Sequence, residues 1–300
     1  MMYTNHLRCS TRIRRSTMIV AMALTASLAA LSVASPALAK EPMGEFARFK
    51  HCPLKNPATQ SCIYAETTSG EFKVKTTTVP IVNTITLQGG LPETEGDETP
   101  IPAEGVESLS KTPQPVPGGL LNLIKCKEIK NFFARIACEI VFEKGALGVN
   151  ATAELVGLPT INKSNLLLEE GIALKLPVRI HLENAFLGNE CFVGSPTSPV
   201  TLSLTTGITS PPGPNKPITG KAGELAFSEE GNLTTVTNNS LVNNSYSVPK
   251  SSGCGGIFSI FIDPIVDAKL GLPSEAGNNT AILNSTLRVA TREGVEGSEK

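Results

Sequence analysis

The chain has 300 residues, 40% of them hydrophobic and 18% charged, and its formal net charge at pH 7 is −1. This length and composition suffice for one large or two small globular domains. A chain so close to neutrality has no electrostatic reason to bind nucleic acid or an anionic membrane surface, which excludes the basic binding proteins.

Residues 1–39 have the three-part pattern of a secretory signal peptide. Arginines without any acidic residue come first, and the apolar residues 18–31 follow, a stretch shorter than the roughly 20 residues of a membrane-spanning helix. The small residues Ala37 and Ala39 frame a cleavage site, so we predict cleavage after Ala39 and secretion to the cell envelope or beyond. The alternative is an uncleaved anchor or a buried helix. Cleavage would remove Arg8, Arg12, Arg14 and Arg15 and leave 22 basic against 27 acidic residues, a net charge of −5.

Six cysteines follow the leader, an even number that is typical of a disulfide framework in an exported protein. A structural zinc site would need close pairs such as C-x-x-C, and the sequence has none. Loop closure favours pairing between near neighbours in the sequence. We therefore predict the pairs Cys52–Cys62, Cys126–Cys138 and, by elimination, Cys191–Cys254.

The segment 40–88 is predicted to hold a disulfide loop and the first strands. Residues 71–78 and 81–87 alternate between apolar and polar side chains, as half-buried strands do, and Pro80 between them indicates a bend or an edge position. Residues 89–119 are rich in proline, glycine and acidic side chains, a composition that predicts an exposed loop. The alternative for this loop is cation binding by its acidic residues.

The best helix candidate opens the main domain, which we place at residues 120–300. Apolar residues recur at three-to-four spacing up to Gly145, a suitable C-cap, so a helix is predicted near residues 128–144. Cys126 and Cys138 would lie about 18 Å apart on one straight helix. Their pairing therefore requires that the helix begin after Cys126 or break beyond it.

Short strand-like runs separated by turn residues fill the rest of the chain. A second helix is predicted at residues 264–270, with Asp263 as its N-cap and Pro264 at its first position. Many short strands with turns between them predict a mainly β fold, an antiparallel sandwich or barrel with two short helices. The strand candidates are residues 147–156, 171–176, 178–182, 200–204, 234–248 (a hairpin) and 281–289.

Few residues suited to catalysis follow the leader, where His51 and His181 are the only histidines. No G-x-S-x-G nucleophile motif and no metal-ligand spacing is present, so we assign no catalytic, cofactor-binding or metal residue and expect no cofactor. The alternative is a secreted hydrolase in which His181 works with a carboxylate such as Glu183 or Glu190.

Three stretches carry a resemblance to known proteins: FARFKHCPL (46–54), NECFVGSP (189–196) and DPIVDAKLGLP (263–273). They resemble uncharacterised exported proteins of high-GC Gram-positive bacteria, over most of the chain that follows the leader. The resemblance implies secretion from a bacterium and implies no activity.

The sequence thus predicts a disulfide-stapled, mainly β protein of the cell envelope or the medium, with a binding or structural role rather than an enzymatic one. The expected partner is another extracellular molecule or an apolar small molecule, because many strands can enclose a pocket. Nucleic acid is not expected as a partner, and no segment after the leader is long enough to span a membrane.

Overall fold

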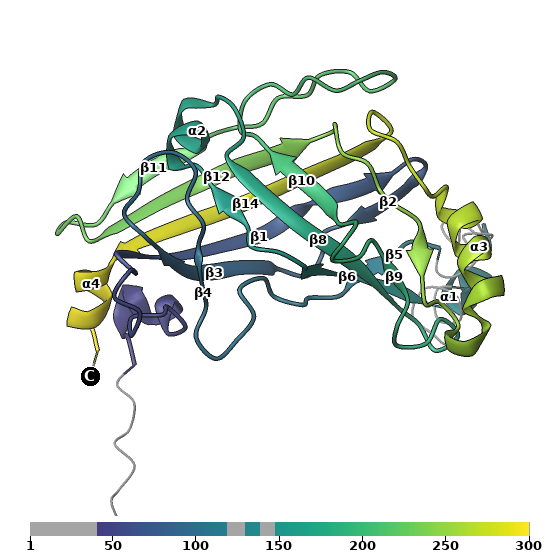
Figure 1. Cartoon of the computed structure of the whole chain (residues 1–300), viewed down its shortest axis with the longest axis horizontal. Coiled ribbons are helices and arrows are strands. Elements are labelled where there is room, and N and C mark those ends of the chain that lie inside the picture. Colours follow the sequence, from purple (N-terminus) through teal and green to yellow (C-terminus); the bar gives the residue numbers. More distant parts are fainter. Residues whose placement is uncertain (1–40, 119–129, 139–147, 300) are drawn as a thin grey trace, which may run out of the picture. The chain divides into compact units, whose positions relative to one another are not determined.

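A computed structural model describes residues 41–118, 130–138 and 148–299. The structure confirms the mainly β class, since its strands form two antiparallel sheets to which helices are attached (Figure 1). Residues Lys40–Lys300 form one compact unit. No helix in the described part of the chain is long and apolar enough to cross a membrane.

The first sheet is built around the longest strands, which come from the two ends of the unit. β1 pairs with β14 along its whole length, and a bulge interrupts their register between Thr67 and Ser69. The strand order is β11-β12-β14-β1-β3-β4, and β2 pairs with β1 beside this path. The bounds are β1 (Ser61–Val74), β2 (Thr77–Pro80), β3 (Ile85–Leu91), β4 (Ile101–Pro102), β11 (Glu224–Phe227), β12 (Leu233–Asn243) and β14 (Asn279–Thr291).

The second sheet is built around β8, which pairs with β6, β7, β9 and β10. The strand order is β13-β9-β8-β6-β5, with β10 and β7 attached to β8. The bounds are β5 (Gln114–Val116), β6 (Val149–Leu155), β7 (Thr160–Ile161), β8 (Leu174–Glu183), β9 (Phe192–Val193), β10 (Val200–Leu204) and β13 (Ser251–Ser252).

Several of the strand predictions differ from the structure. Residues 71–78 are not one strand, because a turn separates the end of β1 at Val74 from the start of β2 at Thr77, and the strand predicted at 81–87 begins only at Ile85. Residues 171–176 and 178–182 belong largely to one strand, β8, which continues through Pro177. The predicted hairpin at 234–248 is wrong, because β12 is one continuous strand and its hairpin partner is β11. The segment 89–119 is not simply an exposed loop: it supplies β4 to one sheet and β5 to the other, and its Glu98 is buried.

Four α-helices are described where the sequence predicted two. Of the first predicted helix, near residues 128–144, residues 132–138 form α1, and residues 139–144 lie outside the described part of the chain. The predicted start of the second helix is wrong: the helix begins at Ser259, with Pro264 inside it, and Asp263 does not cap it. Its end before Gly271 is as predicted, because that glycine is a left-handed C-cap. The bounds are α1 (Phe132–Cys138), α2 (Lys163–Leu168), α3 (Ser259–Leu270) and α4 (Arg292–Gly297), with the 3-10 helices η1 (Gly44–Phe49) and η5 (Gly256–Phe258).

The main core lies between the two sheets and is built from their alternating inward side chains. On β10, for example, Val200, Leu202 and Leu204 are buried while Thr201 and Ser203 between them are half-buried. A smaller second core joins the ends of the unit around η1 and α4. Its buried members are Phe49, Cys52, Cys62, Leu233, Ala290 and Val295.

Candidate functional site

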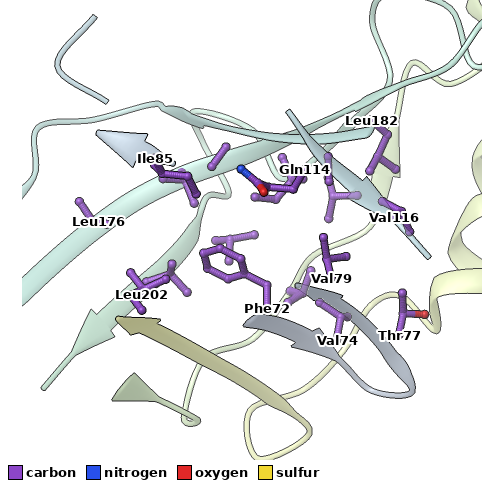
Figure 2. Close-up of a pocket in the computed structure, with 18 of the residues that line it drawn as sticks. Phe72, Val74, Thr77, Val79, Ile85, Gln114, Val116, Leu176, Leu182 and Leu202 are labelled. Atoms are coloured by element: carbon purple, nitrogen blue, oxygen red, sulfur yellow. The ribbon is translucent and has the colours of Figure 1, made fainter. Parts of the chain in front are cut away.

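The strongest candidate site is an apolar cavity of about 200 Å³ between the two sheets (Figure 2). Phe72 on β1 projects into this space, and Leu176 and Leu202 reach it from the opposite sheet. The cavity arises because inward side chains of both sheets meet without filling the gap, although most protein interiors pack with few voids of this size. The cavity therefore depends on the tertiary structure, and no single strand determines it.

Aliphatic side chains from both sheets make up nearly the whole wall of the cavity. Two polar side chains in the wall are already satisfied. Gln114 accepts hydrogen bonds from the backbone N–H of Val82 and of Asn83 (2.9 and 3.0 Å) and donates to the carbonyl of Asn83 (2.7 Å). The Tyr246 hydroxyl lies 3.2 Å from the carbonyl of Lys73 and 3.1 Å from that of Thr280. The apolar wall is formed chiefly by Val74, Val79, Ile85, Leu87, Ala151, Ala153, Val178, Ile180, Leu182, Leu241, Val248 and Leu283.

One end of the cavity, beside α3, carries polar groups that have no partner among the described residues. The buried Oγ1 of Thr77 makes no hydrogen bond, and the exposed Lys269 lies at the rim without an ion pair. The turn between β1 and β2 brings these groups to the same end, because Lys75 lies against Gly271 at the end of α3. Its Nζ donates to the carbonyl of Pro273 (3.4 Å). The cavity is thus apolar along its length and polar at one end.

The predicted cysteine pairs are present wherever both cysteines are described. Cys52–Cys62 joins the N-terminal loop to β1, and Cys191–Cys254 ties the loop before β9 to the loop before α3. The pair Cys126–Cys138 falls partly outside the described residues, because residues 119–129 are not among them. The helix α1 begins at Phe132, after Cys126, as that pairing would require.

His181 lies on β8, on the face opposite the cavity wall, and its buried Nε2 makes no hydrogen bond to a described residue. Its ring stacks on Phe192 with centroids 4.6 Å apart, and its Nδ1 is 3.6 Å from Oε1 of Glu183, beyond hydrogen-bond distance. Glu183 accepts a hydrogen bond from Thr152 instead (3.1 Å). Among the described residues, no hydrogen bond joins His181 to a serine or cysteine. The described part of the chain therefore does not bring a nucleophile, a base and a carboxylate together at His181.

The remaining candidates from the sequence lie apart from the cavity wall. His51 is bonded through Nδ1 to the carbonyl of Glu104 (3.1 Å), and Glu190 is an exposed side chain. In the acidic segment, the buried Glu98 lies 2.8 Å from Nζ of Lys163. The described residues contain no group of three or more His, Cys, Asp or Glu side chains that could hold a metal ion.

A second hollow lies across β12 and β14 and is lined by polar side chains. Its amides and hydroxyls largely bond to one another or to the backbone: Ser240 donates to Asn284 (2.8 Å), and Asn239 donates to the carbonyl of Ala222 (3.0 Å). These internal bonds leave few groups to recognise a ligand. The cavity between the sheets is therefore the better candidate.

Comparison of the chain with known protein families, curated proteins and solved structures found no match. The cavity has to be interpreted from its own chemistry. The alternating runs in the sequence predict which side chains point inward and therefore which residues form the cavity wall. The pattern of a single strand cannot predict how much space remains between two sheets.

Proposed function

We propose that this protein binds a small amphiphile, with the apolar body of the ligand between the two sheets and its polar head beside α3. The observation that carries the proposal is the aliphatic cavity with its unpaired polar groups at one end. Binding rather than catalysis is the role that this arrangement supports.

The size and chemistry of the cavity favour an apolar occupant over water. A water molecule needs two to four polar partners, and aliphatic walls offer none, so apolar cavities of this kind stay dry and take up apolar molecules. The volume of about 200 Å³ exceeds the roughly 150 Å³ of an engineered cavity that binds benzene. Each methylene group that leaves water contributes about 0.8 kcal/mol to binding.

The polar end favours a ligand with an oxygen-bearing head. The Thr77 hydroxyl can donate a hydrogen bond, and the Lys269 ammonium can pair with a carboxylate or phosphate at the rim. A neutral hydrocarbon would leave both groups unused. We therefore infer that a short-chain acid is a better ligand than an alcohol or alkane of the same length.

Octanoate is a suitable probe, titrated by isothermal calorimetry into purified protein whose intact mass has been checked. Ala153→Phe fills the cavity from β6 and should weaken binding about tenfold or more, because it occupies the space of several methylene groups. The matched control Ala226→Phe places the same side chain on the exposed strand β11 and should leave binding unchanged. Equal affinity of the Ala153→Phe variant and the wild type would refute the cavity as the site.

A second comparison tests the head group. Lys269→Gln should weaken octanoate binding by up to about fivefold, since an ion pair of an exposed lysine contributes at most about 1 kcal/mol. The same change should leave 1-octanol binding unaffected. An equal loss of affinity for octanoate and for 1-octanol would show that Lys269 does not recognise the charge of the head group.

Export with cleavage after Ala39 is part of the same proposal, as is the bacterial origin that the sequence resemblance implies. The two disulfides support export, because such bonds persist in oxidising compartments outside the cytosol. Intact mass of protein recovered from the medium or envelope tests the cleavage site. Native mass spectrometry of the same material would identify any molecule that copurifies.

A further inference from the structure

The helix α3 differs from an ordinary surface helix, whose outer face is polar. Its exposed positions are apolar apart from Lys269 at one edge. Ile260 is 76% exposed, Phe261 68% and Ile265 54%. The preceding η5 adds Ile257, 91% exposed, and Phe258, 59% exposed. We call these five side chains the α3 patch.

Both carboxylates of α3 turn inward and are used by the fold. Asp263 accepts hydrogen bonds from the backbone N–H of Gly253 (3.2 Å) and Cys254 (2.8 Å). Asp267 accepts from the backbone N–H of Ser251 (2.7 Å) and from its hydroxyl (2.8 Å). The apolar outer face is therefore a consequence of a fixed helix orientation and not of a loosely packed helix.

The segment that presents the α3 patch is also held firmly at its start. Cys254 is bonded to Cys191, and the backbone N–H of Gly255 donates to the carbonyl of Leu187 (2.6 Å). The neighbouring Phe186, 61% exposed, stands in that same turn. Exposed aromatic and aliphatic side chains on a rigid support mark an interaction surface.

We propose that the α3 patch docks on a lipid surface and that the cavity exchanges its ligand with that surface. This inference rests on the proposed function, because the inner face of the same helix lines the cavity through Val266 and Leu270. Lys269 follows Ile265 by one helical turn and stands at the cavity rim, so the patch and the cavity wall lie on two faces of one helix that meet at this lysine. Docking by the patch therefore brings the lipid surface close to the rim at which an amphiphile enters the cavity.

The driving force for docking is burial of apolar side chains and not net charge. The chain without the leader carries a predicted net charge of −5, which opposes an anionic surface. The outer face of α3 itself has no acidic residue, so nothing on it repels phosphate headgroups. Exposed aromatic and aliphatic side chains of a helix can insert into the headgroup region of a membrane, as those of interfacial helices do.

Flotation with phosphatidylcholine vesicles tests the docking directly, using protein that lacks the leader as verified by intact mass. We expect the wild type to float with the vesicles and to remain bound in high salt. The double change Phe261→Ser and Ile265→Ser should lower the partition coefficient at least about tenfold, since each side chain contributes roughly tenfold when buried. The matched control, Leu225→Ser with Phe227→Ser, removes exposed apolar side chains of β11 at the opposite end of the unit and should float like the wild type (Figure 1).

The absence of tryptophan from the chain provides a second readout that does not depend on the serine variants folding. Phe261→Trp should show a blue-shifted emission with vesicles and quenching by brominated lipid, whereas Phe227→Trp should show neither. Failure of the wild type to float, or equal behaviour of both tryptophan variants, would overturn the docking. So would a dimer, in solution without lipid, that the serine changes at the α3 patch convert to monomer.

The two proposals can fail separately. Octanoate binding that depends on Ala153, together with no flotation, would leave the cavity as a binding site and remove the lipid surface. Flotation without octanoate binding would leave the docking surface and remove the proposed ligand class.

Discussion

Gly70 shows how a single residue holds the first sheet together. Its φ is +125°, a conformation that side-chain-bearing residues rarely adopt, and a Cβ there would lie 1.9 Å from the carbonyl oxygen of Ile282. Glycine thus lets β1 run close against β14 just beyond the bulge.

Gly70→Ala should lower the free energy of unfolding by about 3 kcal/mol, because the obstacle is backbone and cannot rotate away. Urea unfolding followed by circular dichroism measures the change. The control Gly297→Ala, in α4 with no atom near its Cβ position, should stay within about 1 kcal/mol of the wild type. Similar stabilities of the two variants would contradict this account of Gly70.

Tyr246 links stability to alkaline pH. Burial raises the pKa of its phenol above the ordinary value of about 10, because the interior disfavours the charged phenolate. Above pH about 10 the unfolded chain releases this proton while the folded protein keeps it, so Tyr246 makes stability fall as pH rises there. Tyr246→Phe should cost about 1 kcal/mol at neutral pH through the lost hydrogen bond. Urea unfolding at pH values from about 9 to 11 should show that the difference in free energy of unfolding between this variant and the wild type becomes smaller as pH rises. A difference that stays constant over this range would contradict a buried, neutral phenol.

At the scale of elements, Asp267 decides how α3 sits on the second sheet. Ser251 on β13 is buried, and its N–H has Asp267 as acceptor. Asp267→Ala leaves this N–H unpaired and should cost about 2 kcal/mol. Hydrogen exchange at Ser251 should quicken accordingly. Asp267→Asn keeps an acceptor oxygen in place and should retain more of the protection, and equal exchange in both variants would show that the bond is not responsible.

At the scale of the whole molecule, the protein has two separate cores, and only the main one contains the proposed binding cavity. Val295 is fully buried in the core where α4 meets η1, and it does not line the cavity. Val295→Ala should therefore lower the free energy of unfolding by about 2 kcal/mol while leaving octanoate affinity unchanged. Leu283→Ala, a change in the cavity wall, should alter both quantities. A loss of affinity in Val295→Ala would show that the cores are coupled.

Local patterns in the sequence predicted much of the fold. The alternation around Ile180 and Leu182 identified the central strand β8, and the short separation of Cys52 and Cys62 identified their pair. The pair Cys191–Cys254 was predicted by elimination, and the structure contains it. The break expected at Pro177 did not occur. On one side of β8, pairing with β6 ends at Val178 and pairing with β7 begins at Lys175, so the missing N–H costs no bond there.

Other errors came from contacts that no local window contains. Asp263 followed by Pro264 has the local form of a helix start, but the carboxylate of Asp263 is needed by the backbone of Gly253 and Cys254. The helix therefore begins at Ser259 and includes the proline. The candidate His181 was correctly placed on a half-buried strand, yet its neighbours are Phe192 and Glu183, and no nucleophile is bonded to it within the described residues.

The sequence by itself determined the strand-rich class and the pair Cys52–Cys62, because side-chain periodicity and closure of a short loop act over short distances along the chain. The pair Cys191–Cys254 followed from the sequence only by elimination. Only the tertiary structure decided that the two sheets leave an apolar space between them and that α3 turns its apolar side chains outward. Both features depend on how distant segments pack, since the width of a gap and the facing of a helix are set by the partners across it.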